Sequence, residues 1–292
     1  MNYELIIKKI LKESKLEIEL VSDTNNKVFK VKTANEILYA KFYSNSSAHI
    51  DNELKVYDLV DNKYLKELIY KSESPRIAIF KELVGKTIDE LLTDELEDKS
   101  DLIVESVVDY FEKISIHKVK GYGILDENLN GKYSDFFEFL NLRQSATSLI
   151  LKDYPELSGI FDLIMKKYKD IIVVDNSLVP IDTNLKNIMV LNDGSIKFVD
   201  PGEMISAPIL MGYGDFVAHT YKTVLYDKLM QRLKLDDKEL KLLRIYAIFS
   251  SLNILAFLKN HGVTKLSEVI PYGNKYTFYE LINEHLKYLD LK

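Results

Sequence analysis

Cysteine is absent from this sequence of 292 residues. Disulfide bonds, thiolate nucleophiles and cysteine-ligated zinc are therefore excluded. Histidine is scarce, and none of the five histidines forms the His-x-x-x-His or His-Glu-x-x-His spacing of a zinc site. Any bound metal is consequently expected to be a hard cation with oxygen ligands. These histidines are His49, His117, His219, His261 and His285.

An excess of positive charge and a long apolar run are also missing. The formal net charge is −6, whereas nucleic-acid binding normally requires a basic surface, so we expect no nucleic-acid partner. No run approaches the roughly 18 apolar residues of a membrane span, and the amphipathic opening, residues 1–14, has no long apolar core. We therefore expect no membrane association and a cytoplasmic location.

The length of the chain and a change in its pattern predict two parts. Single cores stop growing at about 250–300 residues, which favours two lobes here. Residues 16–43 contain three short β-branched and aromatic runs, typical of an antiparallel meander. Residues 46–62 predict a helix with serine caps, and residues 77–80 predict a strand that leads into a polar link at 81–86. From residue 87 the pattern is mainly helical, with short strand pairs only around 178–200.

The link contains a motif that imitates a phosphate-binding P-loop. Gly85, Lys86 and Thr87 form the end of such a loop, after a strand and before a possible helix. A P-loop also needs a glycine five residues before the second glycine, so that the backbone can wrap a phosphate, and here that position is Phe80. The P-loop interpretation is therefore rejected.

Two aspartates and an asparagine lie at the ends of apolar, strand-like runs. Asp182 follows one run, Asn187 precedes the next, and Asp200 ends the run after that. Such side chains at buried strand ends need a partner. A carboxylate that orients a hydroxyl, followed by an amide and a carboxylate that hold magnesium, is the set that phosphoryl transfer uses. Alone, each would be an ordinary turn residue; the combined spacing favours function.

A lysine in an otherwise apolar strand gives this set a cation. Lys41 stands in ILYAKFY, where alternation places it on the same face as Tyr39 and Tyr43. In the following helix Glu53 lies one turn from Tyr57, on the inward stripe. A lone lysine and a lone carboxylate in apolar surroundings each need a partner, so we predict that Lys41 and Glu53 contact each other.

These residues, in this order, resemble the aminoglycoside phosphotransferase and choline kinase family. The resemblance extends over most of the chain and implies an α+β, bilobal, protein-kinase-like fold. Its lobes would be residues 1–83, with a small antiparallel sheet, and residues 84–292, mainly helical. The matching segments are Lys41, NELKVYDLV with Glu53, the link after IAIF, GKYSDFFEFL at 131–140, DTNLKN at 182–187, FVDPGE at 198–203 and GYGDFVAHT at 212–220.

The resemblance also implies cofactors and roles. ATP would lie under the meander with its adenine on the backbone of the link, and Mg²⁺ would accompany it. Asp182 would be the catalytic base, Asn187 and Asp200 would bind Mg²⁺, and Lys41 with Glu53 would serve the phosphates. Asp215 would support the catalytic loop. The expected contacts of the adenine are Lys81, Glu82 and Leu83.

The sequence departs from the family pattern at two places, and these departures leave a second function possible. The family usually has His-Gly before the catalytic aspartate, where this chain has Pro180 and Ile181. The first turn of the meander, residues 22–27, lacks a glycine, so Ser22 or Asn26 would serve the phosphates. The alternative is therefore a catalytically silent pseudokinase that binds nucleotide or acts as a scaffold.

The acceptor is expected to be a small hydroxylated molecule. Carboxylates at Asp135, Glu138 and Glu203 could line a cleft for a cationic substrate, although acidic residues on helices usually form a solvated face. We place aminoglycoside-like antibiotics ahead of choline-like amines and sugars. The aromatic residues Phe136, Phe137, Phe139 and Tyr213 are predicted to belong to the core.

Overall fold

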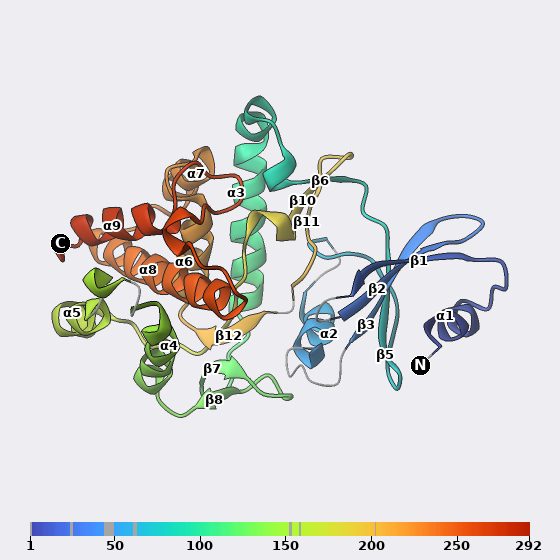
Figure 1. The fold of residues 1–292 in the computed structure, drawn as a ribbon, viewed down its shortest axis with the longest axis horizontal. Helices are drawn as coiled ribbons and strands as arrows, with labels where there is room; N and C mark the ends of the chain where they lie inside the picture. Colours follow the sequence, from blue (N-terminus) through green and yellow to red (C-terminus); the bar gives the residue numbers. More distant parts are fainter. Residues whose placement is uncertain are drawn as a thin grey trace.

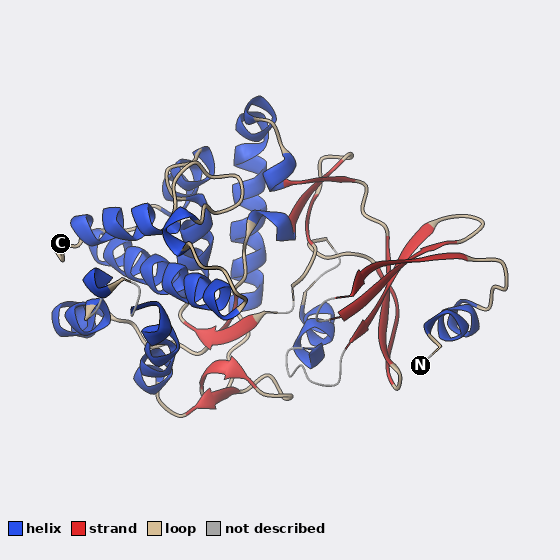
Figure 2. Ribbon diagram, viewed as in Figure 1, coloured by secondary structure: helices blue, strands red, loops and turns tan. Residues whose placement is uncertain are grey.

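The computed structural model places a small antiparallel sheet at one end of the molecule and a larger helical part at the other (Figure 1; Figure 2). Helix α2 (Ile50–Leu59) lies between them. The fold is therefore α+β and bilobal, as the sequence predicts. The structure describes residues 2–23, 26–43, 50–60, 63–151, 154–157, 159–201 and 203–292.

The N-terminal sheet has five antiparallel strands in the spatial order β1-β2-β3-β5-β4. They are β1 (Glu17–Asp23), β2 (Asn26–Lys32), β3 (Ile37–Tyr43), β4 (Leu68–Glu73) and β5 (Arg76–Lys81). The meander predicted over residues 16–43 is confirmed, although residues 24–25 of its first turn lie outside the described part. β5 contains the predicted strand 77–80. The sequence does not predict β4, because its mostly exposed residues show no buried apolar face.

The two faces of this sheet have different partners. Helix α1 (Tyr3–Leu11), which begins after the N-cap Asn2, covers the outer face. Side chains alternate along β3, so Tyr39 and Lys41 share the opposite face, as predicted. Both residues line a cavity on that face. The buried cluster on the outer face consists of Ile7, Phe29, Val31, Leu38, Ala40, Phe42, Ile77 and Ile79.

Helix α2 confirms the helix predicted in residues 46–62, over a shorter range. The predicted serine caps lie outside the described residues. Val56 and Glu53 on this helix are buried, and the ring of Tyr57 lies 5.6 Å from that of Phe80 on β5. The inward face of α2 therefore packs against the inner face of the sheet.

The larger part is organised around the long helices α3 and α8. Most of α8 is buried, and it begins with a capping box between Asp236 and Glu239. The α-helices are α3 (Thr93–Ser115), α4 (Phe136–Leu151), α5 (Ile160–Tyr168), α6 (Ile209–Thr220), α7 (Val224–Leu233), α8 (Asp237–Asn260) and α9 (Phe278–Tyr288). Short 3₁₀ helices are η1 (Ile88–Glu90), η2 (Pro155–Leu157), η3 (Lys169–Ile171), η4 (Leu185–Asn187) and η5 (Leu266–Glu268).

Two small sheets interrupt the helices, with the orders β11-β10-β6 and β8-β7-β12-β9. Their strands are β6 (Gly85–Thr87), β7 (Tyr122–Leu125), β8 (Gly131–Tyr133), β9 (Ser177–Pro180), β10 (Ile188–Leu191), β11 (Ile196–Phe198) and β12 (Met204–Ala207). The expectation of strand pairs only around 178–200 is thus wrong. The additional strands have only three or four residues, and β6 and β12 pair with distant segments, whereas β7 and β8 form a short local hairpin with a register shift. Strands this short leave too little local pattern to predict them.

Helix α8 also corrects the expectation about apolar runs. By length and composition it could cross a membrane, with a mean hydropathy of 1.5 over an 18-residue window. However, 72% of that window is buried inside the protein. Burial of this kind is the property of a core helix, and α8 contacts α4, α6 and α9 in this structure.

Candidate active site

Asp182 lies in the loop that leaves β9, five residues before Asn187. Its φ of 62° is in the left-handed region, which aspartate tolerates better than most residues. Asn184 Nδ2 donates to Asp182 Oδ1 at 2.8 Å, and Asn187 Nδ2 donates to Asp182 Oδ2 at 2.9 Å. Asn187 Nδ2 also donates to the Asp182 carbonyl at 2.9 Å. The two asparagines therefore fix the orientation of the Asp182 carboxylate.

The surroundings of Asp182 favour its protonated form. Asp182 is exposed to solvent, but the protein around its carboxyl group displaces part of the surrounding water. This partial desolvation raises the pKa of the Asp182 carboxyl to about 7, and the negative charges of Glu203 and Asp215 act in the same direction. The hydrogen bonds from Asn184 and Asn187 oppose this rise. A carboxyl group with a pKa near neutrality is suited to exchange a proton at physiological pH.

Asp215 on α6 supports the loop from behind. Its Oδ2 accepts hydrogen bonds from the backbone amide and the hydroxyl of Thr183, both at 2.8 Å, and its Oδ1 accepts from the Ser250 hydroxyl on α8. All three residues are buried. The Thr183 amide, next to Asp182, is thus held by the Asp215 carboxylate. That carboxylate is in turn positioned by α6, which carries it, and by α8, which carries Ser250. This contact is the one that the family resemblance implies for Asp215.

Pro180 and Ile181 occupy the place of the usual His-Gly pair. Pro180 pairs with Met204 between β9 and β12, and the amide of Ile181 donates to the Glu203 carbonyl at 2.9 Å. Helix α6 approaches β9 closely at Gly212, where a Cβ atom would lie 2.5 Å from a side-chain carbon of Val179. Backbone pairing and close packing therefore hold the start of the loop without a histidine.

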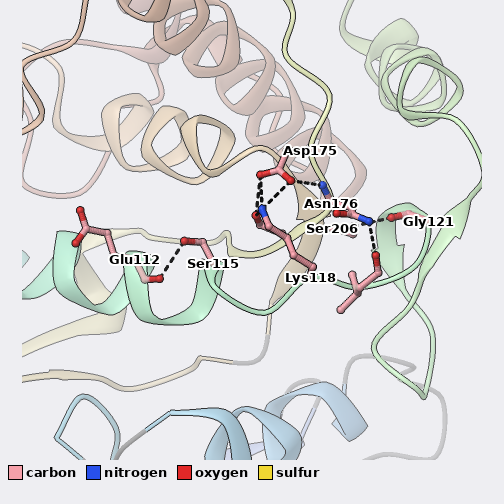
Figure 3. A network of polar contacts seen from close by, with 9 residues as sticks. Glu112, Ser115, Lys118, Gly121, Asp175, Asn176 and Ser206 are labelled. Atoms are coloured by element: carbon pink, nitrogen blue, oxygen red, sulfur yellow. Dashed lines mark hydrogen bonds and ion pairs between the residues drawn. The ribbon is translucent and has the colours of Figure 1, made fainter.

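A polar network holds the other end of β9 (Figure 3). Lys118, which follows α3, forms an ion pair with Asp175 at 2.7 Å and donates to the Ser177 hydroxyl. Asn176 Nδ2 donates to the backbone carbonyl of Val119. Because these groups join the segment after α3 to β9, the strand that leads into the Asp182 loop is fixed at both ends.

Asn187 and Asp200 flank the hairpin of β10 and β11 at the same end, Asn187 just before β10 and Asp200 two residues after β11. The amide of Val199 donates to the Asn187 carbonyl at 2.8 Å, one residue before Asp200. An amide oxygen and a carboxylate are hard ligands, and magnesium in proteins usually takes one or two such ligands and completes its shell with water and phosphate. Among the described residues, no group of three or more histidine, aspartate or glutamate side chains is arranged so that it could hold a metal ion. The Asn187 and Asp200 pair fits magnesium bound together with a nucleotide.

Lys41 joins the two parts of the molecule. Its Nζ lies 2.7 Å from Glu53 Oε2 on α2 and 3.1 Å from Asp200 Oδ1. Lys41 and Glu53 are only 8% and 3% exposed. Burial alone would lower the pKa of Lys41, but the charges of Glu53 and Asp200 raise it above its usual value. The contact predicted between Lys41 and Glu53 is present, and the ammonium is retained.

A cavity of about 470 Å³ opens beside these residues, between the sheet and the β10–β11 hairpin. Several predicted nucleotide contacts line it, while Glu53 and Glu82 do not. Glu53 is instead held by Lys41, and the Glu82 carboxylate lies 3.2 Å from Lys30 Nζ. The lining residues are Ser22, Asn26, Val28, Tyr39, Lys41, Lys66, Phe80, Lys81, Leu83, Met189, Val199 and Asp200.

The link offers one amide to this cavity. The amides of Lys81 and Glu82 already donate to Glu67 and Ile37 at 3.0 Å each, as part of the sheet. No hydrogen bond occupies the Leu83 amide within the described part of the chain. Leu83 therefore has a backbone amide without a partner in the described part of the chain, whereas the amides of Lys81 and Glu82 are already engaged in the sheet.

Three residues of the site are not predicted from the sequence. Asn184 and Ser250 act through hydrogen bonds to Asp182 and Asp215, and Lys66 enters the cavity from the segment before β4. Asn184 is the one with a local signal, because it stands within DTNLKN. The other two reach the site only through tertiary contacts.

The residues considered for binding the acceptor differ in burial and in their effect on Asp182. Phe136, Phe139 and Tyr213 are buried core residues and Phe137 packs against that core, as predicted. Glu203 acts on Asp182 through its charge. The two remaining predicted cleft carboxylates, Asp135 and Glu138 at the start of α4, are both exposed.

A small antiparallel sheet above a helical lobe, with a lysine–glutamate pair and strand-end polar residues between them, is the arrangement of the protein-kinase-like fold. No protein-family model and no curated protein matches the sequence. Solved structures do match over nearly the whole chain. Aminoglycoside phosphotransferase APH(4)-Ia has a TM-score of 0.69 at 13% identity, covering 98% of this chain and 96% of its own.

Two further solved structures extend this likeness to other phosphotransferases. Choline kinase LicA from Streptococcus pneumoniae has a TM-score of 0.67 at 16% identity, covering 100% of both chains. A putative fructosamine-3-kinase from Haemophilus somnus 129PT has a TM-score of 0.58 at 12% identity, covering 97% of this chain and 96% of its own. The chain therefore has the protein-kinase-like fold that these small-molecule kinases share.

Proposed function

We propose that this protein is an ATP-dependent phosphotransferase that moves the γ-phosphoryl group to a hydroxyl of a small molecule. The observation that carries the proposal is the position of Lys41, whose ammonium contacts Glu53 from one lobe and Asp200 from the other beside an open cavity. A buried lysine held between two carboxylates next to a cavity is suited to bind an anionic nucleotide there.

Each lobe has its own part in the proposed function. Residues 1–83 would form the nucleotide-binding lobe, in which the Leu83 amide and the Lys81 and Glu82 carbonyls hold the base, and Ser22, Asn26 and Lys41 hold the phosphates. Residues 84–292 would form the lobe with the catalytic and metal loops and the substrate cleft.

Asp182 would act on the acceptor. Its carboxylate, oriented by Asn184 and Asn187, would accept the proton of the substrate hydroxyl as the hydroxyl oxygen attacks the γ-phosphorus. The bond between the γ-phosphorus and the β,γ-bridging oxygen would break at the same time, with ADP as the leaving group. Asn187 and Asp200 would hold Mg²⁺, which when bound supplies charge neutralisation for the phosphates. Glu53 would keep Lys41 in place throughout.

The acceptor is proposed to be small and hydroxylated, and aminoglycoside-like molecules come first. Solved structures of the APH(4)-Ia neighbour include a ternary complex with ADP and hygromycin B, and LicA has been solved with AMP. The negative charge of Glu203 near Asp182 is compatible with a cationic acceptor such as an aminoglycoside or a choline-like amine. We also propose a cytoplasmic location, where ATP is available.

A pseudokinase remains the second candidate, because Pro180 and Ile181 replace the usual His-Gly. The decisive experiment has two stages. Nucleotide binding is measured as thermal stabilisation by ATP and Mg²⁺, and ADP release is then measured with aminoglycosides, choline, ethanolamine and small sugars. ADP release that depends on one acceptor class supports the phosphotransferase. Stabilisation without ADP release over the whole panel would favour a nucleotide-binding pseudokinase. If both signals are absent, the phosphotransferase and the nucleotide-binding pseudokinase are contradicted, and only the scaffold is left.

A further inference from the structure

Lys66 lies between α2 and β4. Its backbone position is fixed by the contacts of the residues before and after it. Leu65 forms a parallel β-bridge with Phe198. The carbonyl of Glu67 accepts a hydrogen bond from the Lys81 amide at 3.0 Å. The half-buried side chain of Lys66 between them lines the same cavity as the proposed nucleotide contacts.

The ammonium of Lys66 lies over an aromatic ring. Its Nζ is 4.1 Å from the centroid of the Phe80 ring, and no described carboxylate forms an ion pair with it. Burial lowers the pKa of Lys66; the charges of Glu53 and Asp200 oppose this, whereas the ammonium of Lys41 adds to it. A ring face offsets only part of the loss of water around a cation. The cavity therefore holds a second positive charge that is incompletely satisfied.

We propose that Lys66 is a second nucleotide-binding cation, whose ammonium donates to a phosphate oxygen of the bound nucleoside triphosphate. The inference rests on the proposed function and adds a binding residue to it. It is carried by the position of Lys66 in the cavity and by its lack of a carboxylate partner among the described residues.

A polyanion is the ligand that this arrangement favours. The charge of Lys41 is already matched by Glu53 and Asp200, at 2.7 Å and 3.1 Å, whereas that of Lys66 is not. A lysine ammonium is a point charge that suits phosphate oxygens. The glycine-free sequence of the first turn also makes a second cation useful, because glycine is what usually lets a backbone approach phosphates closely.

The test compares Lys66→Met with the unchanged protein in equilibrium binding of adenosine, AMP, ADP and ATP without magnesium. Methionine retains most of the length and packing of lysine and removes its charge. We expect adenosine affinity to be unchanged, and the loss of affinity to grow with the number of phosphates, to about tenfold to a hundredfold for ATP.

A second measurement separates binding from folding. Removal of an unpaired, half-buried charge should leave stability in urea equal or higher, so the expected result is weaker ATP binding without loss of stability. The matched control is Lys71→Met on β4, whose exposed ammonium pairs with Asp58 at 2.9 Å outside the cavity. This control should bind all four ligands normally.

Other outcomes are decisive as well. Equal affinity of Lys66→Met and the unchanged protein for ATP would overturn the inference. An equal loss for adenosine and ATP would assign Lys66 to the base or to packing, and would overturn it too. If the unchanged protein binds none of the four ligands, the proposed function fails first, and the inference fails with it.

Discussion

At the scale of single residues, Asp182 separates an enzyme from a scaffold. Asn184 and Asn187 orient its carboxylate, and the Asp182→Asn change keeps the size of the side chain while it removes the proton acceptor. A contact made mainly in the transition state affects turnover more than nucleotide binding. We expect single-turnover transfer to fall by about 10²- to 10⁴-fold with nearly unchanged ATP affinity.

Asp98→Asn is the matched control, since Asp98 is exposed on α3 and no role in binding or catalysis is proposed for it. It should transfer phosphate normally. Normal transfer by Asp182→Asn would show that Asp182 is not the proton acceptor and would remove it from the mechanism.

Lys41 and Glu53 should behave as one unit. Their charges are 2.7 Å apart and nearly excluded from water, so the loss of either partner leaves the other charge unpaired. Lys41→Met and Glu53→Gln should each lower kcat/KM for ATP. When the losses in kcat/KM are expressed as free energies, the loss in the double variant should be smaller than the sum of the two single losses. The difference, which is the coupling energy of the pair, should be about 0.5–3 kcal/mol. Additive losses in this double-mutant cycle would show that the pair does not interact in solution.

At the scale of elements, the contact between α8 and α9 makes stability depend on pH. Arg244 Nη1 on α8 lies 3.2 Å from Nδ1 of the fully buried His285 on α9. Burial and the charge of Arg244 lower the pKa of His285 from its ordinary value of 6.5 to about 3. Between these values the unfolded chain binds a proton that the folded protein does not. Stability is therefore lost as the pH falls from about 6.5 toward 3.

The measurement is the free energy of unfolding in urea at pH 7 and pH 5. His285→Gln keeps an acceptor for Arg244 but does not titrate, so it should avoid about 2 kcal/mol of the loss at pH 5. The exposed His261 on the C-terminal side of α8 provides the control His261→Gln, which should follow the unchanged protein. Parallel pH profiles for all three proteins would contradict the assignment to His285.

At the scale of the whole molecule, Asp200 contacts Lys41 of the other lobe at 3.1 Å, and we propose it as a magnesium ligand beside the nucleotide. ATP and Mg²⁺ at about 100 times the dissociation constant should add roughly 2.7 kcal/mol to native stability. Asp200→Ala should keep the fold but lose the magnesium-dependent part of this stabilisation, together with turnover, because Asn187 alone is a poor magnesium site. Magnesium-dependent stabilisation and transfer that persist in Asp200→Ala would show that the proposed metal site is wrong.

The sequence alone determined the parts of the molecule whose signal is local. The meander over residues 16–43, the inward position of Lys41 and the strand-end positions of Asp182 and Asp200 all follow from alternation and from polar residues at the ends of apolar runs. Strand periodicity depends on neighbouring residues, so a single sequence carries it.

Only the tertiary structure decided which distant groups meet. Lys41 and Asp200 are 159 residues apart in the chain, and the support of Thr183 by Asp215 and Ser250 joins a loop to two helices. Lys66 precedes an edge strand, and its neighbours in sequence give it no pattern that points to a cavity. The pairing of β6 with β10 likewise depends on backbone hydrogen bonds between distant segments. Such contacts form when the chain buries its apolar surface as a whole, and short segments by themselves do not specify them.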